Sequence, residues 1–318
     1  MADGSGTVRT VDGRSVSVGG VDPRMPPSLV AGAGKVWSYR LDSGDVSVID
    51  PAAAKVTGHG GVPVATPLVE NRLIVAHKAL WIGQPGKLSR ITPSGQVTQV
   101  ALPERLMPSA ATATRRWLWL ASGKRLLRID PAAAAQPSQP GQASGSAQAA
   151  GVVETALPES VGELDSGYAA GINSPVVRRL DPDTGRVVAE VRMPHDELVM
   201  SLAGGWAIGN CGTAMRLTDR LAVRVADVSQ DLPAVAAVGS LWVGDEVRSE
   251  IVRIDAASGH VLARMPFVAS DPDDPAFYLV AGESTVWVLD QGVSKVDTVA
   301  NRVARVRDVP GMASAVAY

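Results

Sequence analysis

The chain has 318 residues, a formal net charge of −2 and a single cysteine, Cys211. The balanced charge argues against nucleic acid as a partner, because there is neither a basic excess nor a basic run. One cysteine allows no intramolecular disulfide. The sequence contains no run of 18 apolar residues, so nothing in it predicts a membrane-spanning segment. The opening "MADGSGTVRTVDG" lacks the apolar core of a signal peptide. The sequence as it stands therefore predicts a cytoplasmic protein, with export after removal of a leader as the alternative.

One unit recurs along the chain, and its clearest copy is "SLWVGDEVRSEIVRIDAASGHVLARMP", Ser240 to Pro266. Other copies begin at residues 34, 78, 116, 167, 204 and 284. The aromatic residues that the copies share are Trp37, Trp81, Trp119, Tyr168, Trp206, Trp242 and Trp287. These aromatic residues are 36 to 49 positions apart, which is the span of one four-stranded blade of a β-propeller.

Each copy predicts four strands in a fixed order. A short strand of small apolar residues, such as "LIVA" or "YLVA", suits the crowded centre of a ring. The strand with the aromatic residue follows, and its indole can wedge between neighbouring sheets. An alternating strand such as "EIVRID" comes third, and a turn such as "DPDTG" leads to the fourth. The sequence therefore predicts an all-β, single-domain β-propeller over residues 1–318, with seven blades of four antiparallel strands.

Three segments lie outside the repeat. Residues 1–26 contain a predicted hairpin, "TVRTVDGRSVSVGG", and residues 310–318 resemble a further inner strand. These two ends either close a ring of seven blades, which is the favoured interpretation, or combine into an eighth blade. Residues 132–151 are rich in Ala, Gln, Ser and Pro, and this composition predicts a flexible insert between strands three and four of the third blade.

The order of strands places the loops on two faces of the ring. We name one the connection face, because it carries the connections between blades together with the loops between strands two and three. The turn face carries the other turns. Since propellers usually bind ligands at the mouth of the channel, we expect a ligand on the connection face. The predicted ligand-binding rim consists of Arg40, Gln84, Arg105, Asn210, Cys211, Asp231, Glu246, Arg248 and Gln291.

Acidic residues gather on the part of that rim formed by blades five to seven. His195 stands at the start of blade five and is the candidate general base, with Asp245 and Asp290 as candidate catalytic carboxylates. Asp231, Asp245 and Asp290 supply the oxygen ligands that Mg²⁺ or Ca²⁺ would take. Solvated loops of the same composition are the alternative, and a binding function requires no cofactor.

The recurrent unit resembles the YVTN/YncE-like bacterial propellers and the broader group that includes virginiamycin B lyase. Blades of the lyase group carry a His eleven residues before the Trp and a Glu three residues after it. In "PHDELVMSLAGGW", His195 stands eleven residues before Trp206, while Gly209 takes the position of the Glu. The resemblance implies a propeller fold and, for the lyase group, a His base assisted by carboxylates and Mg²⁺.

Two functions follow from these observations, and whether the protein is an enzyme stays open between them. The first is a recognition module that binds a small molecule, a peptide or a partner protein at the channel mouth. The second is a metal-assisted lyase or cyclase that acts on a small natural product, with His195 as general base.

Overall fold

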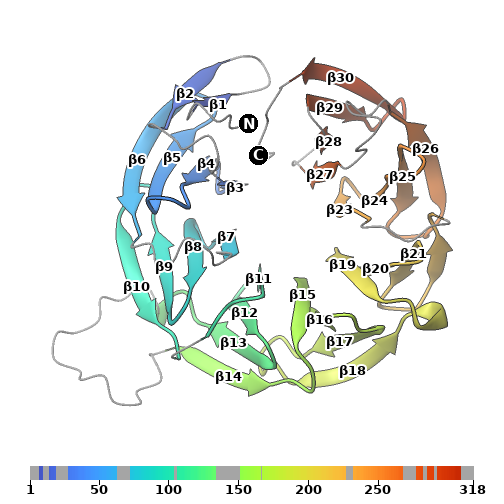
Figure 1. Ribbon diagram of the computed structural model, residues 1–318, viewed down its shortest axis with the longest axis horizontal. Coiled ribbons are helices and arrows are strands. Elements are labelled where there is room, and N and C mark those ends of the chain that lie inside the picture. Colours follow the sequence, from blue (N-terminus) through green and yellow to red (C-terminus); the bar gives the residue numbers. More distant parts are fainter. Residues whose placement is uncertain are drawn as a thin grey trace.

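The computed structural model describes residues 7–9, 14–18, 28–62, 72–103, 106–133, 151–165, 167–226, 232–267, 277–281, 285–289 and 292–308. These residues form seven four-stranded antiparallel sheets and one two-stranded sheet. Figure 1 shows the seven sheets in a ring, with the first strand of each sheet innermost and the fourth at the rim. The seven-bladed propeller predicted from the repeat is therefore confirmed.

The strands of the seven blades follow one another in chain order. Blade one contains β3 (Ser28–Gly32), β4 (Lys35–Tyr39), β5 (Asp45–Asp50) and β6 (Lys55–Gly61). Blade two contains β7 (Arg72–Ala76), β8 (Ala79–Gln84), β9 (Lys87–Ile91) and β10 (Val97–Ala101). Blade three contains β11 (Ala110–Ala113), β12 (Leu118–Ser122), β13 (Arg125–Ile129) and β14 (Val152–Ala156). Blade four contains β15 (Val161–Asp165), β16 (Tyr168–Gly171), β17 (Val176–Leu180) and β18 (Val187–Arg192).

The remaining three blades repeat this order. Blade five contains β19 (Val199–Ala203), β20 (Trp206–Gly209), β21 (Thr213–Arg216) and β22 (Ala222–Arg224). Blade six contains β23 (Ala234–Ala237), β24 (Ser240–Asp245), β25 (Glu250–Asp255) and β26 (Val261–Pro266). Blade seven contains β27 (Tyr278–Ala281), β28 (Val286–Leu289), β29 (Gly292–Asp297) and β30 (Arg302–Asp308). A short 3-10 helix, η2 (Pro194–Asp196), connects blades four and five.

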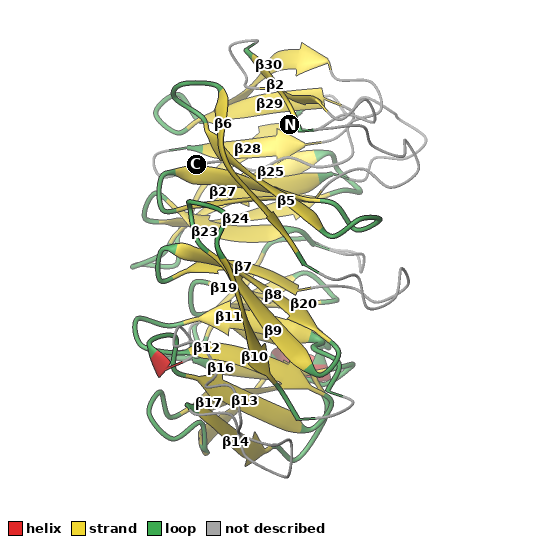
Figure 2. Cartoon of the chain, turned by 90° about the vertical axis from the view of Figure 1, so that its left-hand side faces the viewer, coloured by secondary structure: helices red, strands yellow, loops and turns green. Residues whose placement is uncertain are grey.

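The ends of the chain are described only in part. β1 (Thr7–Arg9) and β2 (Ser15–Ser17) form the predicted antiparallel hairpin. Its buried valines pack with Leu29, Val36 and Ile49 of blade one. The predicted closing strand at 310–318 lies outside the described residues, as does most of the insert, which joins β13 to β14. In the side view of Figure 2 the strands cross the thickness of the disc, and loops gather on its two faces.

The hydrophobic core is a series of interfaces between neighbouring blades rather than one central cluster. Trp81 of blade two packs with Leu118 and Leu120 of blade three, and Trp206 of blade five with Leu241 of blade six. Both indoles are almost completely buried. A buried Trp removes about 150–250 Å² from water, and the predicted position of the indole between neighbouring sheets is confirmed for Trp81 and Trp206.

The inner strands are closely packed around the centre of the ring, as their small residues predict. A Cβ atom placed on Gly32 of β3 would lie 2.5 Å from Val75 Cγ1 of β7, the inner strand of the next blade. Real Cβ atoms do not approach so closely, and overpacking of this kind destabilises a core. The inner strands therefore need small residues where neighbouring blades converge.

A cation lies over the Trp ring in several blades. Where strands two and three pair, Arg90 lies directly opposite Trp81 in blade two, and Arg253 lies directly opposite Trp242 in blade six. These guanidinium carbons lie 5.8 and 5.0 Å from the ring centroids, within the range of a cation–π interaction. The Arg of the "RID" pattern therefore packs against the same side chain that fills the interface between blades.

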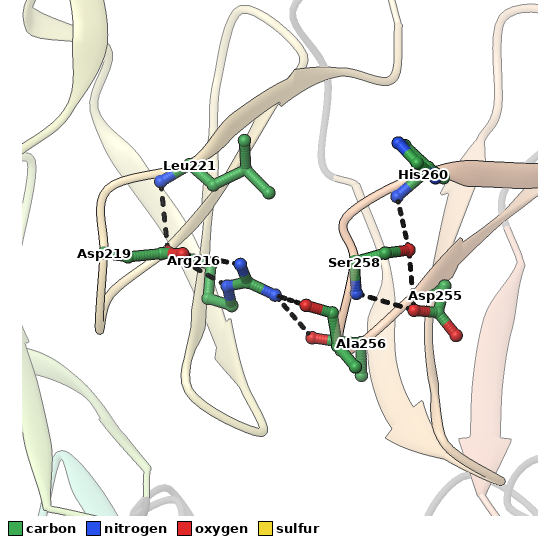
Figure 3. A network of polar contacts seen from close by, with 8 residues as sticks. Arg216, Asp219, Leu221, Asp255, Ala256, Ser258 and His260 are labelled. Carbon is green, nitrogen blue, oxygen red and sulfur yellow. Dashed lines mark hydrogen bonds and ion pairs between the residues drawn. The ribbon is translucent and has the colours of Figure 1, made fainter.

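Two arginines that lie over a Trp, Arg216 over Trp206 and Arg253 over Trp242, also reach the turn of the next blade, and we call this contact the arginine clasp. Arg253 of β25 donates Nη1 hydrogen bonds to Thr298 O at 2.6 Å and Asn301 Oδ1 at 2.9 Å, in the turn between β29 and β30. Arg216 of β21 donates to Ala256 O at 2.9 Å across the boundary between blades five and six (Figure 3). One side chain thus joins the aromatic of its own blade to the backbone of the following one.

Aspartates that end strand three hold these turns in shape. Asp255 accepts hydrogen bonds from Ser258 N at 2.6 Å and Ser258 Oγ at 2.7 Å (Figure 3). The Ser258 N–H is the main reason why the pKa of Asp255 lies below its usual value. The Ala300 N–H lowers the pKa of Asp297 in the same way. Arg216 lowers the pKa of Asp219 to about 2.

We expect Arg253→Gln to destabilise the ring because it removes the charged donor that joins blades six and seven. Hydrogen bonds from a charged group contribute about 1.5–3 kcal/mol, so the free energy of unfolding in urea should fall by about 2 kcal/mol. Arg302→Gln is the control, because this exposed side chain makes only a 3.7 Å ion pair with Asp297. Equal losses in the two variants would contradict the clasp.

We expect stability to fall as the pH drops from about 4 towards 2. The turn aspartates have lower pKa values in the folded chain than in the unfolded chain, so their contribution is complete above the unfolded value and disappears as each folded carboxylate is protonated. Urea unfolding at a series of pH values measures this slope, which Asp255→Asn should reduce. A stability that stays constant over this range would contradict the role given to these turns.

Candidate functional site

The predicted rim residues of blades one and two help to shape their own loops. Arg40 is half-buried after β4 and pairs with Asp42 at 2.7 Å and Asp45 at 3.6 Å. Its hydrogen bond to Asp42 lowers the pKa of that carboxyl. Gln84 is buried at the end of β8, where its Oε1 accepts a hydrogen bond from Ser89 Oγ at 3.5 Å. Both side chains lie on the connection face, and the contacts described for them above are with neighbouring residues of the same blade.

Asn210 and Cys211 form the turn between β20 and β21. Asn210 N donates to Leu198 O at 2.8 Å, and Leu198 N donates to Asn210 Oδ1 at 2.9 Å. The exposed Cys211 thiol lies 3.5 Å from Asn210 Oδ1. Asn210 therefore fastens the turn of blade five to the connection that carries His195.

His195 is exposed within η2 and has left-handed backbone, with φ of 53°. Asp196 follows with φ of 57° and pairs with Arg192 at 2.7 Å. Two successive left-handed residues that are not glycine cost of order 1–3 kcal/mol each, and such strain occurs often at functional sites. Among the described residues the His195 ring has no hydrogen-bond partner, so no carboxylate orients it there.

A buried glutamate, Glu197, lies beside Gly209, which is the residue three positions after the aromatic Trp206. Its side chain is 2% exposed and accepts hydrogen bonds from Thr213 Oγ1 at 2.5 Å and Thr213 N at 3.2 Å. A Cβ atom on Gly209 would overlap this carboxylate. The connection between blades four and five therefore places a buried carboxylate beside Gly209.

Blade four repeats this arrangement. A Cβ atom on Gly171 would overlap the carboxylate of Glu159, which pairs with the buried Arg178. In both blades the glutamate comes nine residues before the aromatic and the glycine three after it. This paired spacing is a signal in the sequence, but neither glutamate was among the predicted site residues.

Asp245, the predicted catalytic and metal-binding carboxylate of blade six, is buried with 4% of its side chain exposed. Its Oδ1 accepts a hydrogen bond from Arg248 N at 3.1 Å, and its Oδ2 lies 3.5 Å from Arg248 Nη1. Glu246 Oε1 accepts a hydrogen bond from Phe277 N at 3.5 Å. The Asp245 carboxylate therefore closes its own loop between β24 and β25.

Four predicted residues, Arg105, Asp231, Asp290 and Gln291, lie outside the described residues. Within the part of the chain that the structure describes, no three His, Cys, Asp or Glu side chains come close enough together to hold a metal ion. Asp245 is thus the single member of the predicted metal set whose surroundings the structure shows.

A pocket of about 410 Å³ opens between blades five and six. It lies near the connection face, because Arg224 pairs with Thr213 at the start of β21 and Glu250 begins β25. Its lining residues are Arg224, Val225, Ala226, Arg248, Glu250 and Arg264. Among the predicted rim residues only Arg248 is in this set. Arg224 and Arg264 lie on the outer strands β22 and β26, and the outer strands of blades four and seven also contain arginines, so no sequence signal separates these two.

Each arginine of the pocket has a carboxylate partner. Arg264 Nη1 donates to Glu250 Oε1 at 2.7 Å and to Val225 O of the neighbouring blade at 3.0 Å. Arg224 Nη1 is 3.6 Å from Glu197 and Arg248 Nη1 is 3.5 Å from Asp245. The three arginine side chains are 40–51% exposed, whereas Glu197 and Asp245 are buried. The pocket therefore presents guanidinium groups to solvent, with the carboxylates behind them.

Comparison with known proteins places the fold but not the family. No family model and no curated protein matches the chain. Among solved structures, virginiamycin B lyase from Staphylococcus aureus is similar with a TM-score of 0.56 at 15% identity, over 84% of this chain and 92% of that one. The Pan2 WD40 domain of Neurospora crassa has a TM-score of 0.56 at 11% identity, over 84% of this chain and 86% of that one.

Apo AztD from Citrobacter koseri is also similar, with a TM-score of 0.51 at 12% identity, over 83% of this chain and 86% of that one. These three proteins have different names but share one architecture. At sequence identities of 11–15% the similarity shows the propeller fold alone. None of the described residues forms a helix long and apolar enough to span a membrane.

We expect Asp245→Ala to lower stability, because it leaves Arg248 N without its acceptor and opens the loop between β24 and β25. A lost hydrogen bond at a buried acceptor costs about 1–3 kcal/mol, which urea unfolding can measure. Asp196→Asn is the control, since Asp196 is exposed and pairs only with exposed Arg192, and asparagine tolerates the left-handed backbone at this position. If Asp245→Ala unfolds like the parent chain, the carboxylate does not hold this loop.

Proposed function

We propose that the chain is a recognition module that binds a small molecule, or the end of a peptide, on the connection face between blades five and six. The single observation that carries this proposal is the pocket in which exposed guanidinium groups rest on buried carboxylates. Groups that are already held in place lose little freedom when a ligand arrives, and this favours binding. The function requires no cofactor, and its partner is neither nucleic acid nor membrane.

The buried carboxylates described on the connection face of blades five and six support binding rather than proton transfer. Asp245 accepts hydrogen bonds from its own loop, and Glu197 from Thr213. A general base must lie within hydrogen-bond reach of the proton that it takes from the substrate. Buried carboxylates that are engaged in this way act better as supports for the arginines in front of them.

A lyase or cyclase with His195 as general base is the second candidate. One observation favours it: His195 is exposed on the connection face in strained, left-handed backbone. Backbone strain of this kind is often kept for a functional reason. Within this proposal Asp231 and Asp290 would join Asp245 around Mg²⁺ or Ca²⁺.

Ligand capture from a metabolite extract, followed by native mass spectrometry, distinguishes the two candidates. We expect the protein to retain a compound and to release it without chemical change. Its binding should not respond to Mg²⁺, Ca²⁺ or EDTA. The variant Arg224→Gln/Arg248→Gln should lose it. His195→Asn should keep it, since asparagine tolerates left-handed backbone better than alanine does. Turnover of the compound, abolished by His195→Asn, would replace the recognition module with the lyase.

A further inference from the structure

The N-terminal hairpin lies against blade one in the place where a preceding blade would lie. Between complete blades, the residue before the aromatic and its partner on strand three face the aromatic of the preceding blade. Leu241 and Ile254 of blade six face Trp206 of blade five in this way. The corresponding pair in blade one is Val36 and Ile49. This pair packs against the buried valines of the hairpin, which are Val8, Val16 and Val18.

A polar contact gives the hairpin the same position. Arg14, which directly precedes β2, donates a hydrogen bond to Ala52 O in the turn between β5 and β6. Ala52 stands two residues after the end of β5. Arg216 of blade five donates to the carbonyl at the equivalent place in blade six, which is Ala257 O. Figure 1 shows the hairpin on the side of blade one that lies away from blade two. The hairpin therefore occupies the boundary between blades seven and one, which we call the seam.

Blade seven presents its aromatic residue to the other side of the seam. Trp287 of β28 alternates with Val286 and Val288, which pack in the same cluster as Trp242 of blade six. Because successive side chains of a strand point to opposite faces, Trp287 faces the seam. Among the described residues Trp287 is only half-buried, whereas Trp206 and Trp242 are at most 2% exposed. The described residues thus give Trp287 less cover than a following blade gives the others.

The inner strands show where this cover is incomplete. From β3 to β27, each inner strand packs against the inner strand of the next blade. No comparable contact joins β27 to β3 among the described residues. The hairpin has the sequence pattern of strands three and four, since "TVRTVD" resembles "VVRRLD" at residues 176–181. The hairpin therefore provides outer strands, and the seam still needs an inner strand beside the channel.

The chain that follows blade seven has the sequence of a connection to such a strand. Several blades end with a buried aliphatic residue and a proline, as at Leu157–Pro158. Val309–Pro310 repeats this pair directly after β30. β15 begins three residues after Pro158, and the same spacing places an inner strand at residues 313–317. This segment, "ASAVA", has the small residues of "AATA" in β11 and "AVAA" in β23.

From these observations we infer that residues 313–317 form an inner strand between β27 and β3. With β1 and β2 this strand makes a closing sheet, which joins the two ends of the chain and covers the facing sides of blades seven and one. An apolar sheet face is stable only when another layer covers it. Neither segment supplies a counterpart of strand two, so the closing sheet stands beside seven complete blades. The inference is independent of the proposed recognition function.

Removal and return of the segment test the inference. A chain that ends at Asp308 should unfold about 5 °C below the parent chain, because blades seven and one lose part of their cover. Deletion of residues 138–147 from the insert removes as many residues and should leave the unfolding temperature unchanged. A synthetic peptide with the sequence of residues 309–318 should bind the shortened chain and restore its unfolding temperature. Failure of the folded, shortened chain to bind this peptide would overturn the inference.

Hydrogen exchange locates the segment. Exchange in β3 and β27 should increase in the shortened chain and return to the parent level when the peptide is added. Exchange in β11 and β15, on the opposite side of the ring, should not change (Figure 1). An increase spread evenly over all blades, or one that leaves β3 and β27 unaffected, would contradict the position given to the strand.

A variant of the full chain keeps the inference testable if the shortened chain does not fold. Consecutive residues of a strand point to opposite faces, so Ala315→Asp/Val316→Asp puts one charge against a neighbouring strand. This variant should lower the unfolding temperature and raise exchange in β3 and β27. Ala143→Asp/Ala147→Asp, in the insert, is the matched control and should change neither. Equal behaviour of the two variants would overturn the inference.

The oligomeric state distinguishes closure within one chain from exchange between two copies. We expect the parent and shortened chains to have the same mass in light scattering, because the segment stays with its own ring. A dimeric parent chain that becomes monomeric when residues 309–318 are removed would mean that the segment closes the ring of a second copy. That result would overturn closure within one chain.

Discussion

The contact between neighbouring blades is the constraint on which this molecule depends. No blade can bury its own faces, so a tryptophan fills several of the interfaces from one side, as Trp206 and Trp242 do. The arginine opposite it, Arg216 or Arg253, stacks on the indole and then bonds to the turn of the following blade. Hydrophobic burial supplies most of the stabilisation, while the arginine sets the orientation of one sheet against the next.

The candidate binding pocket uses the same boundary between blades. On the turn face, Arg216 is enclosed by Asp219 and by the carbonyl groups of the next blade. On the connection face of the same pair of blades, Arg264 crosses to Val225 O in the opposite direction, but the space beside it stays open. An arrangement that closes the ring on one face thus leaves a lined pocket on the other.

The acidic rim predicted from the sequence has a different character in the structure where it is described. Asp245 was the carboxylate singled out for catalysis, yet it is buried beneath Arg248. Glu197 is buried beneath Arg224 in the same way. Counting acidic residues along the chain suggests a negative surface, but burial decides which charge meets the solvent. At the pocket between blades five and six the most exposed charged groups are arginines.

The sequence by itself determined the architecture of this protein. A spacing of 36 to 49 residues between aromatic positions, strands of alternating polarity and an Asp-capped turn together require seven similar sheets. These features are local, so each copy of the repeat states them independently. The position of His195 on the connection face could be predicted for the same reason, because strand order alone assigns a loop to a face.

Only the tertiary structure decided which side chains meet. Arg224 and Arg264 lie on outer strands of different blades, 40 residues apart, and look like many other exposed arginines. Their shared pocket exists because blades five and six pack at a particular distance, which the indole of Trp206 and its neighbours maintain. Glu197 fills the space beside Gly209 for a similar reason. Contacts between elements depend on packing in three dimensions, so the recurring spacing of this glutamate and glycine acquires a meaning only once the structure shows the two residues side by side.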